Sequence, residues 1–322
     1  MSRNITLFLI FLLSAQIVFA EKTISKSYMG SEFKLTLCLT NSDSLSNAFE
    51  NGWKEIDRVE QLISSWIISS EVSRINQAAG IHSVLVSKEL YNLLRYSNEI
   101  HQLTQGSFDL TIKPALNIWN WKSGVIPSNK EITKAKKLVG FQNIIFNDSL
   151  FSVFLPKKGM LLDLGGIGKG YASWRVAELW KKNGITTGAI NAGGDLFVFG
   201  KACSKSVWDV SIKNPFKKNE IIYTVKQTNT AIATSGDYER FFQIDSVKYS
   251  HILNPQTCKP IKGITSVTVF AYNPTFADAL ATSISVMGVT VGLDLINQID
   301  GVEAIFILED GTVYLSDQLK SN

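Results

Sequence analysis

The sequence predicts a single α+β domain over residues 21–322, in which helices and antiparallel strands are mixed. Apolar residues recur at three- and four-residue steps in several segments, which indicates amphipathic helices. Short apolar segments flank turn residues in two places, which indicates antiparallel hairpins. A length prior of about 150 residues per domain would allow two domains. No linker, repeat or low-complexity segment divides the chain, so we expect one.

Composition restricts the class of protein. Of the 322 residues, 45% are hydrophobic and 19% are charged, which suits a globular chain with a sizeable core. The formal net charge of +4 is too small to attract nucleic acid. We therefore expect neither a nucleic-acid partner nor a disordered chain.

The first 20 residues differ from the rest. Arg3 precedes an apolar run over residues 5–13, and residues 18–20 suit a cleavage site, so residues 1–20 are predicted to be a signal peptide. That run is too short to cross a bilayer comfortably, and no later segment approaches 18 uninterrupted apolar residues. No cysteine follows the cleavage site to carry a lipid. We expect a soluble mature chain without transmembrane segment, exported to the periplasm or to the outer face of the cytoplasmic membrane.

Cys38, Cys203 and Cys258 are the three cysteines, and their spacing matches no metal motif. In an oxidising compartment an odd number allows at most one internal disulfide and leaves one thiol over. Because free cysteine is among the most buried residue types, we expect small buried residues at all three positions.

The elements follow in order along the chain. Apolar periodicity predicts a helix over residues 45–63, and Ser87 can cap a second one. Ser128 to Glu131 form a capping box that opens a short helix, which Gly140 can close. The segment 106–121 between these two is expected to be irregular.

Strands are expected mainly in the second half of the chain. Hairpins are predicted at residues 143–154, around Asn147-Asp148-Ser149, and around residues 309–312. Further strand candidates are residues 196–199, 207–212, 221–225, 266–271 and 304–308.

A glycine-rich segment, Asp163-Leu164-Gly165-Gly166-Ile167-Gly168-Lys169-Gly170-Tyr171, leads into a predicted helix that ends near Gly184. Free amides at a helix start and a nearby lysine favour phosphate binding. The segment fits neither the Walker pattern nor the dinucleotide fingerprint. By itself it is either a phosphate site or a tight structural turn.

A second glycine-containing segment, Asn191-Ala192-Gly193-Gly194-Asp195, lies between two predicted strands. It is either a backbone cradle for a ligand or simply a turn or bulge.

Residues 233–238 precede His251-Ile252-Leu253-Asn254-Pro255, where a strand end can deliver a side chain into a cleft. The near-neutral pKa of histidine suits proton transfer. His82 and His101 have no chemical group nearby in the sequence, so surface or core roles suffice for them.

Asp278 and Thr282 lie four residues apart within a predicted helix that ends at Gly288, so they share one face. A carboxylate and a hydroxyl are hard oxygen ligands, which suit Mg²⁺ better than zinc. A local hydrogen bond within the helix is the alternative.

Taken together, these segments resemble the ApbE-type FAD:protein FMN transferases. The motifs that carry the resemblance are residues 163–172, 191–195, 234–236, 251–253 and 277–282, with Met29-Gly30, residues 70–76, residues 106–111 and Pro114 before them. They occur in order over nearly the whole mature chain.

The resemblance implies a tunnelling-fold-like α+β domain that binds FAD in a cleft, with Mg²⁺ beside its pyrophosphate. The implied metal ligands are the carbonyl of Gly168 and the side chains of Asp278 and Thr282. The implied reaction is attack of an acceptor protein's threonine hydroxyl on the FMN-side phosphorus of FAD, with AMP as leaving group. His251 is the expected proton acceptor, and Lys169 supplies charge. The implied FAD contacts are Met29, Asn76, Asp109, Gly165, Gly166, Lys169, Asn191, Gly193, Gly194, Asp195, Thr234 and Ser235.

Three positions depart from the family pattern. Trp174 stands where an aspartate is common, Asn254 replaces an aspartate, and Cys258 replaces a glycine. The Asn-Pro pair preserves a turn but removes a charge that would orient His251.

Two other functions fit the same residues. Water could attack in place of threonine, giving a Mg²⁺-dependent FAD pyrophosphatase that yields FMN and AMP. Alternatively, the chain could be a non-catalytic exported flavin-binding protein.

Overall fold

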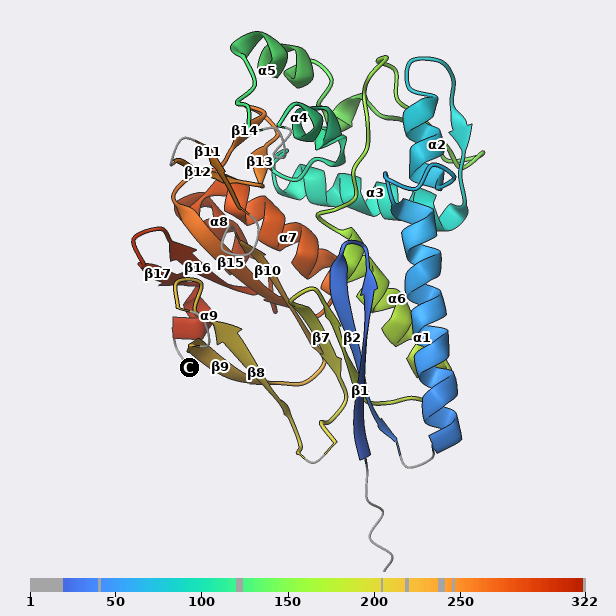
Figure 1. Ribbon diagram of the computed structural model, residues 1–322, viewed down its shortest axis with the longest axis vertical. Helices are drawn as coiled ribbons and strands as arrows, with labels where there is room; N and C mark the ends of the chain where they lie inside the picture. Colours follow the sequence, from blue (N-terminus) through green and yellow to red (C-terminus); the bar gives the residue numbers. More distant parts are fainter. Residues whose placement is uncertain are drawn as a thin grey trace, which may run out of the picture.

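The computed structural model describes residues 20–39, 42–119, 124–203, 205–217, 220–236, 241–244 and 247–320 (Figure 1). Its centre is an eight-stranded antiparallel sheet with the order β1-β2-β6-β7-β10-β15-β16-β17. Its strands are β1 (Ala20–Tyr28), β2 (Ser31–Leu39), β6 (Gly188–Ala192), β7 (Asp195–Phe199), β10 (Thr230–Gly236), β15 (Ile264–Ala271), β16 (Glu303–Leu308) and β17 (Val313–Leu315). Within the described ranges β1 and β17 do not pair, so the sheet is open. The predicted α+β domain is confirmed.

The helices that cover one face of this sheet (Figure 1) include α1 (Ser42–Ile63), α6 (Gly168–Lys182) and α7 (Pro274–Met287). Alternate residues of each strand point to this face, because side chains in a strand alternate with a period of two. Phe197 and Phe199 of β7 join the main core there, whereas Leu196 points to the other face. The helix predicted over residues 45–63 is thereby confirmed.

A separate hairpin packs on the opposite face of the sheet. It consists of β8 (Trp208–Lys213) and β9 (Ile221–Gln227). Val210 and Ile212 lie in one apolar cluster with Ile232 of β10 and Phe270 of β15. The sheet is therefore covered by helices on one side and by a hairpin on the other.

Short helices and a small sheet gather at one end of the molecule, at the top of Figure 1. They are α2 (Glu71–Gln77), α3 (Lys88–Leu103), α4 (Lys113–Ile118), α5 (Asn129–Lys136), β3 (Val84–Leu85), β4 (Ile145–Asn147) and β5 (Ser152–Phe154). The Ser87 cap, the Ser128–Glu131 capping box and the hairpin at residues 143–154 are all confirmed. The hairpin formed by β16 and β17 confirms the one predicted around residues 309–312.

Two local predictions are wrong. The segment 106–121 was expected to be irregular, but it contains the 3-10 helix η1 (Leu110–Ile112) and α4. Pro114 lies in the first turn of α4, where proline is tolerated because the amide there needs no helical partner. Gly140 does not close α5, which ends at Lys136; it precedes the 3-10 helix η2 (Phe141–Asn143) instead.

The remaining elements complete the C-terminal half. They are β11 (Phe241–Ile244), β12 (Val247–Ser250), β13 (Leu253–Asn254), β14 (Lys259–Pro260), α8 (Val289–Asn297) and α9 (Asp317–Lys320). None of the helices in the described ranges is long and apolar enough to cross a membrane. The predicted signal peptide lies outside the described residues, except Ala20, which begins β1.

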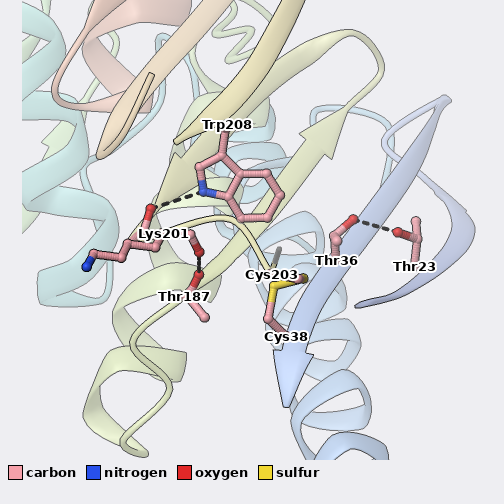
Figure 2. Close-up of a disulfide and its surroundings, with 8 residues drawn as sticks. Thr23, Thr36, Cys38, Thr187, Lys201, Cys203 and Trp208 are labelled. Atoms are coloured by element: carbon pink, nitrogen blue, oxygen red, sulfur yellow. Dashed lines mark hydrogen bonds between the residues drawn. A yellow bond between two sulfur atoms is a disulfide. The ribbon is translucent and has the colours of Figure 1, made fainter. Parts of the chain in front are cut away.

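A disulfide joins Cys38 of β2 to Cys203, which lies between β7 and β8 (Figure 2). One disulfide and one remaining thiol, that of Cys258, agree with the limit that three cysteines set. Cys38 and Cys258 are buried, as expected, whereas Cys203 is partly exposed. Near the bond, the Trp208 indole N–H donates to the carbonyl of Gly200 at 3.1 Å. The disulfide thus ties the segment that leads into β8 to the central sheet.

Replacing Cys203 by serine should lower the free energy of unfolding by about 2–4 kcal/mol, because the disulfide closes a long loop in the unfolded chain. The two cysteines are 165 residues apart in sequence. Denaturant unfolding with and without a reductant measures the difference. The reductant should destabilise the unaltered protein and leave Cys203→Ser unchanged; equal stability of both proteins without reductant would contradict the prediction.

Candidate functional site

A cavity of about 620 Å³ lies where the start of α6, the turn between β6 and β7, the end of β10 and α7 meet. Most of the predicted site residues line it, although the sequence spreads them over residues 109–282. They are Asp109, Gly165, Gly166, Lys169, Asn191, Gly193, Gly194, Thr234, Ser235, His251, Asp278 and Thr282. Met29, Asn76, Gly168 and Asp195 do not line it.

The start of α6 lies directly against α7. The Gly170 amide donates to Oδ2 of Asp278 at 2.9 Å. A Cβ atom at Gly170 would lie 2.1 Å from the carbonyl oxygen of Pro274, so no larger residue fits there without displacing one helix. Glycine at this position therefore allows the backbone of α6 to approach the Asp278 carboxylate.

Asp278 is a buried carboxyl group at the wall of the cavity. Its burial raises its pKa to about 6, and Asp195 adds to this, although the Lys169 ammonium lowers the pKa. Thr282 lies one helical turn later, and its hydroxyl is 3.2 Å from that of Ser235. These oxygen atoms lie close to the glycine-rich segment, since a Cβ atom at Gly166 would be 3.3 Å from Oγ1 of Thr282.

Lys169 forms an ion pair with Asp195. Asp195 is buried at the start of β7, and its Oδ1 accepts the backbone amide of Thr234 at 2.9 Å. Asp195 therefore lies behind the cavity wall, where it holds Lys169 and joins β7 to β10. Its contact with FAD stays a prediction.

The turn between β6 and β7 confirms that residues 191–195 connect two strands. Oδ1 of Asn191 accepts the Gly194 amide at 3.0 Å, and the Gly193 amide donates to the carbonyl of Glu32 at 2.9 Å. Gly193 has a φ of +63°, which favours glycine. These bonds confirm the turn between two strands. The turn also lines the cavity, and its role as a backbone cradle for a ligand stays a prediction.

Asp109 organises another wall of the cavity. Its Oδ1 accepts the Thr111 amide at 2.7 Å and its Oδ2 accepts the Phe141 amide at 3.0 Å. Burial raises the pKa of this carboxyl. His101 was expected to have no chemical group nearby, but its Nδ1 lies 3.9 Å from Oδ2 of Asp109 and donates to the carbonyl of Phe108 at 2.7 Å.

Three predicted site residues are held away from the cavity lining. The Asn76 side chain forms two hydrogen bonds with the backbone of Leu162: its amide group donates to the carbonyl at 3.0 Å, and its oxygen accepts from the backbone N–H at 2.6 Å. The Met29 amide, in the turn between β1 and β2, donates to Glu60 at 2.9 Å. Gly168 is buried as the first residue of α6. Their roles toward FAD or a metal stay predictions.

His251 follows β12 and lines the cavity. Just after it, Oδ1 of Asn254 accepts the backbone amides of Gln256 and Thr257 at 2.8 and 3.1 Å, so this side chain fixes the turn. Cys258 has a φ of +53°, a conformation that glycine adopts without strain. This conformation is a backbone reason for the glycine that the resemblance implies at this position.

Trp174 does not line the cavity. Its ring packs against Phe197 and Tyr272, with centroids 6.1 and 6.3 Å apart, and Lys181 lies 5.4 Å from its ring centroid. The departure from the family pattern at this position thus adds to the packing of α6 on the sheet.

Asp163 and Lys113 had no predicted role at the site. Asp163 lines the cavity at the start of the glycine-rich segment. The buried Lys113 ammonium lies 3.2 Å from Oδ2 of Asp163 and 2.6 Å from the hydroxyl of Ser65. Asp163 begins the glycine-rich segment, but no local pattern pointed to Lys113. Lys34 and Lys213 also line the cavity and had no sequence signal.

No group of three or more His, Cys, Asp or Glu side chains in the described ranges is placed to hold a metal ion. The predicted ligands Asp278, Thr282 and the carbonyl of Gly168 are a set of another kind, with one carboxylate and two neutral oxygens, and their role toward a metal stays a prediction. Such a set suits a cation that completes its coordination with water and substrate phosphates.

Comparison with known proteins supports the same family over most of the chain. The ApbE family profile matches residues 29–306. A curated relative from Klebsiella pneumoniae (strain 342), named FAD:protein FMN transferase, is 30% identical over 292 residues, which cover 89% of each chain. The solved ApbE protein of Thermotoga maritima has a TM-score of 0.87 at 31% identity and covers 94% of this chain and 99% of that one. The flavin transferase ApbE from Vibrio cholerae has a TM-score of 0.84 at 25% identity, with the same coverage. From the profile match and these relatives, this chain belongs to the ApbE family.

Proposed function

We propose that this chain transfers FMN from FAD to a threonine hydroxyl of an acceptor protein and releases AMP. The relative from Klebsiella pneumoniae is named for transfer of FMN from FAD to protein. The observation that carries the proposal to this chain is the one cavity that Lys169, His251, Asp278 and two glycine-containing turns all line. Phosphoryl transfer from a pyrophosphate uses a positive charge, a proton acceptor, a carboxylate and backbone groups that can approach the phosphates closely.

We infer that the site uses Mg²⁺. Asp278, Thr282 and the carbonyl of Gly168 would hold it, because all three offer hard oxygen atoms. The raised pKa of Asp278 fits this assignment, since a buried carboxylate is stabilised by a cation. When bound, the ion neutralises phosphate oxygens and so reduces the repulsion that an attacking hydroxyl meets.

Other residues of the chain position the pyrophosphate and accept the proton. Lys169 places a positive charge at the cavity wall, and Asp195 fixes its position. The turn at residues 191–195 presents backbone close to the ligand because Gly193 and Gly194 carry no side chain. His251 takes the proton of the threonine hydroxyl as its oxygen bonds to the FMN-side phosphorus, and the bond from that phosphorus to AMP breaks.

We propose further that the protein acts outside the cytoplasm. The predicted signal peptide at residues 1–20 supports this, and so does the disulfide between Cys38 and Cys203. Disulfides persist in oxidising compartments and are rare in the cytosol.

The test combines FAD, Mg²⁺ and a purified candidate acceptor with its Thr→Val variant. We expect fluorescent flavin on the acceptor in a denaturing gel, AMP in solution, and neither product in excess EDTA. AMP and free FMN without labelled acceptor would instead identify a pyrophosphatase. Bound FAD with no AMP would identify a flavin-binding protein. Undiminished AMP release in EDTA would overturn the metal assignment.

The affinity for Mg²⁺ should fall as the pH drops below about 6, because a proton then competes for Asp278. At pH 5 about a tenth of this carboxyl is ionised, so we expect roughly tenfold weaker binding than at pH 7.5. The metal-free protein should show the opposite trend in stability. A carboxyl with a raised folded pKa favours folding below its unfolded pKa of about 3.9, and this contribution is lost as the pH rises through 6. Thermal unfolding in a Mg²⁺ titration at both pH values checks this; equal affinities would contradict it.

A further inference from the structure

We propose that Lys113 is a positioning residue that neutralises Asp163 and so allows the cavity to accept a dianionic pyrophosphate. The inference rests on the proposed function and extends it to a residue outside the cavity lining. Lys113 would act on the ligand through Asp163 and the glycine-rich segment.

The Lys113 side chain is held in a closed environment. It is 8% exposed, although lysine is almost never this buried unless it is paired. Its ammonium donates to the hydroxyl of Ser65 at 2.6 Å and to Oδ2 of Asp163 at 3.2 Å. The Ser65 hydroxyl in turn donates to the same carboxylate oxygen at 2.8 Å. The ring of Trp66 covers the ammonium, with its centroid 4.2 Å away.

Asp163 connects this pair to the cavity. Its Oδ1 accepts the Gly165 amide at 2.9 Å, which shapes the first turn of the glycine-rich segment. Its backbone amide donates to the carbonyl of Leu110 at 2.7 Å, which joins that segment to the segment that follows Asp109. Asp163, Gly165 and Leu110 all line the cavity. The position of the phosphate-facing backbone therefore depends on this carboxylate.

The charges around the cavity show why neutralisation matters. Four carboxylates line it, namely those of Glu32, Asp109, Asp163 and Asp278, against the lysines Lys34, Lys169 and Lys213. Two of these lysines are already paired, Lys34 with Glu32 at 3.0 Å and Lys169 with Asp195. An unneutralised Asp163 would repel a ligand with two negative charges, and low-dielectric surroundings strengthen that repulsion. Lys113 cancels this charge without occupying space in the cavity.

The test compares a charged ligand with an uncharged one. ADP carries the pyrophosphate and riboflavin does not. We expect Lys113→Met to bind ADP and FAD about tenfold more weakly and riboflavin unchanged, by calorimetry and flavin fluorescence quenching. Lys113→Arg should bind ADP normally. Lys130→Met, which removes an exposed lysine of α5, is the matched control and should match the unaltered protein.

A second variant separates charge from structure. Lys113→Met combined with Asp163→Asn removes both charges, so ADP binding should recover to within about threefold of the unaltered protein. Asp163→Asn alone leaves the Lys113 charge uncompensated and should bind ADP at least as tightly as the unaltered protein. If Lys113→Met fails to fold, a known consequence of breaking a buried ion pair, the double variant decides the matter, because it removes both charges of the pair.

Three results would overturn the inference: an equal loss of riboflavin and ADP binding in Lys113→Met, a double variant as impaired as Lys113→Met, or weaker ADP binding by Asp163→Asn. The proposed function is judged separately, from FMN transfer by the unaltered protein. If that protein binds FAD but transfers no FMN, the proposed function fails while the comparison of variants still stands.

Discussion

Replacing Asp278 by asparagine should reduce Mg²⁺-dependent FMN transfer by about 100-fold or more, since a metal at a phosphoryl group supplies several kcal/mol. Asparagine keeps the volume of the side chain and an oxygen that can accept the Gly170 amide. The loss should therefore come from metal binding and not from unfolding. Single-turnover transfer at increasing Mg²⁺ concentrations measures it.

Two controls separate a loss of metal binding from a loss of the fold: the thermal stability of the variant and a matched substitution elsewhere. Burial raises the pKa of Asp278, so its charge is costly in the metal-free fold and asparagine should leave thermal stability equal or higher. Asp300→Asn removes an exposed carboxylate and should behave like the unaltered protein. Unchanged Mg²⁺ dependence in Asp278→Asn would remove this residue from the metal site.

Replacing His251 by alanine should slow FMN transfer by about 10²- to 10⁴-fold while FAD binding is spared. Binding depends on the glycine-containing turns, Lys169 and the metal ligands, whereas His251 acts on the attacking hydroxyl. FAD affinity from fluorescence quenching and single-turnover transfer should therefore change independently.

His82→Ala is the control for His251, because His82 is exposed and its Nδ1 lies 2.9 Å from the carbonyl of Ser83. This variant should transfer FMN at the normal rate. Near-normal transfer by His251→Ala would exclude His251 as the proton acceptor. Lost FAD binding would make it a ligand contact instead.

Elements with strong local patterns were predictable from the sequence. The helix α1 has a continuous apolar stripe. At the start of α5, the capping box of Ser128 and Glu131 provides hydrogen-bond acceptors for backbone amides within four residues. By contrast, β1 is an edge strand whose residues 21–27 are mainly polar and exposed, so no alternation of apolar and polar residues predicted it. The small residues of β10 gave an equally weak strand signal.

The cavity itself was predictable in part. The glycine-rich segment, the turn at residues 191–195 and the helix with Asp278 each carried a local motif, and the fold brings them to one cavity. The pairing of Lys113 with Asp163 spans 50 residues and that of Cys38 with Cys203 spans 165. Contacts of this range depend on tertiary packing and leave no periodic trace in the sequence.

The most direct test of the proposed reaction is the ratio of AMP released to FMN attached, measured in a single turnover. The unaltered protein, FAD, Mg²⁺ and the acceptor are mixed, AMP is quantified by chromatography, and the acceptor is analysed by mass spectrometry. We expect one FMN bound to the acceptor threonine for each AMP released, and no product with the acceptor's Thr→Val variant. AMP release that proceeds without any flavin bound to the acceptor would contradict the proposed transfer.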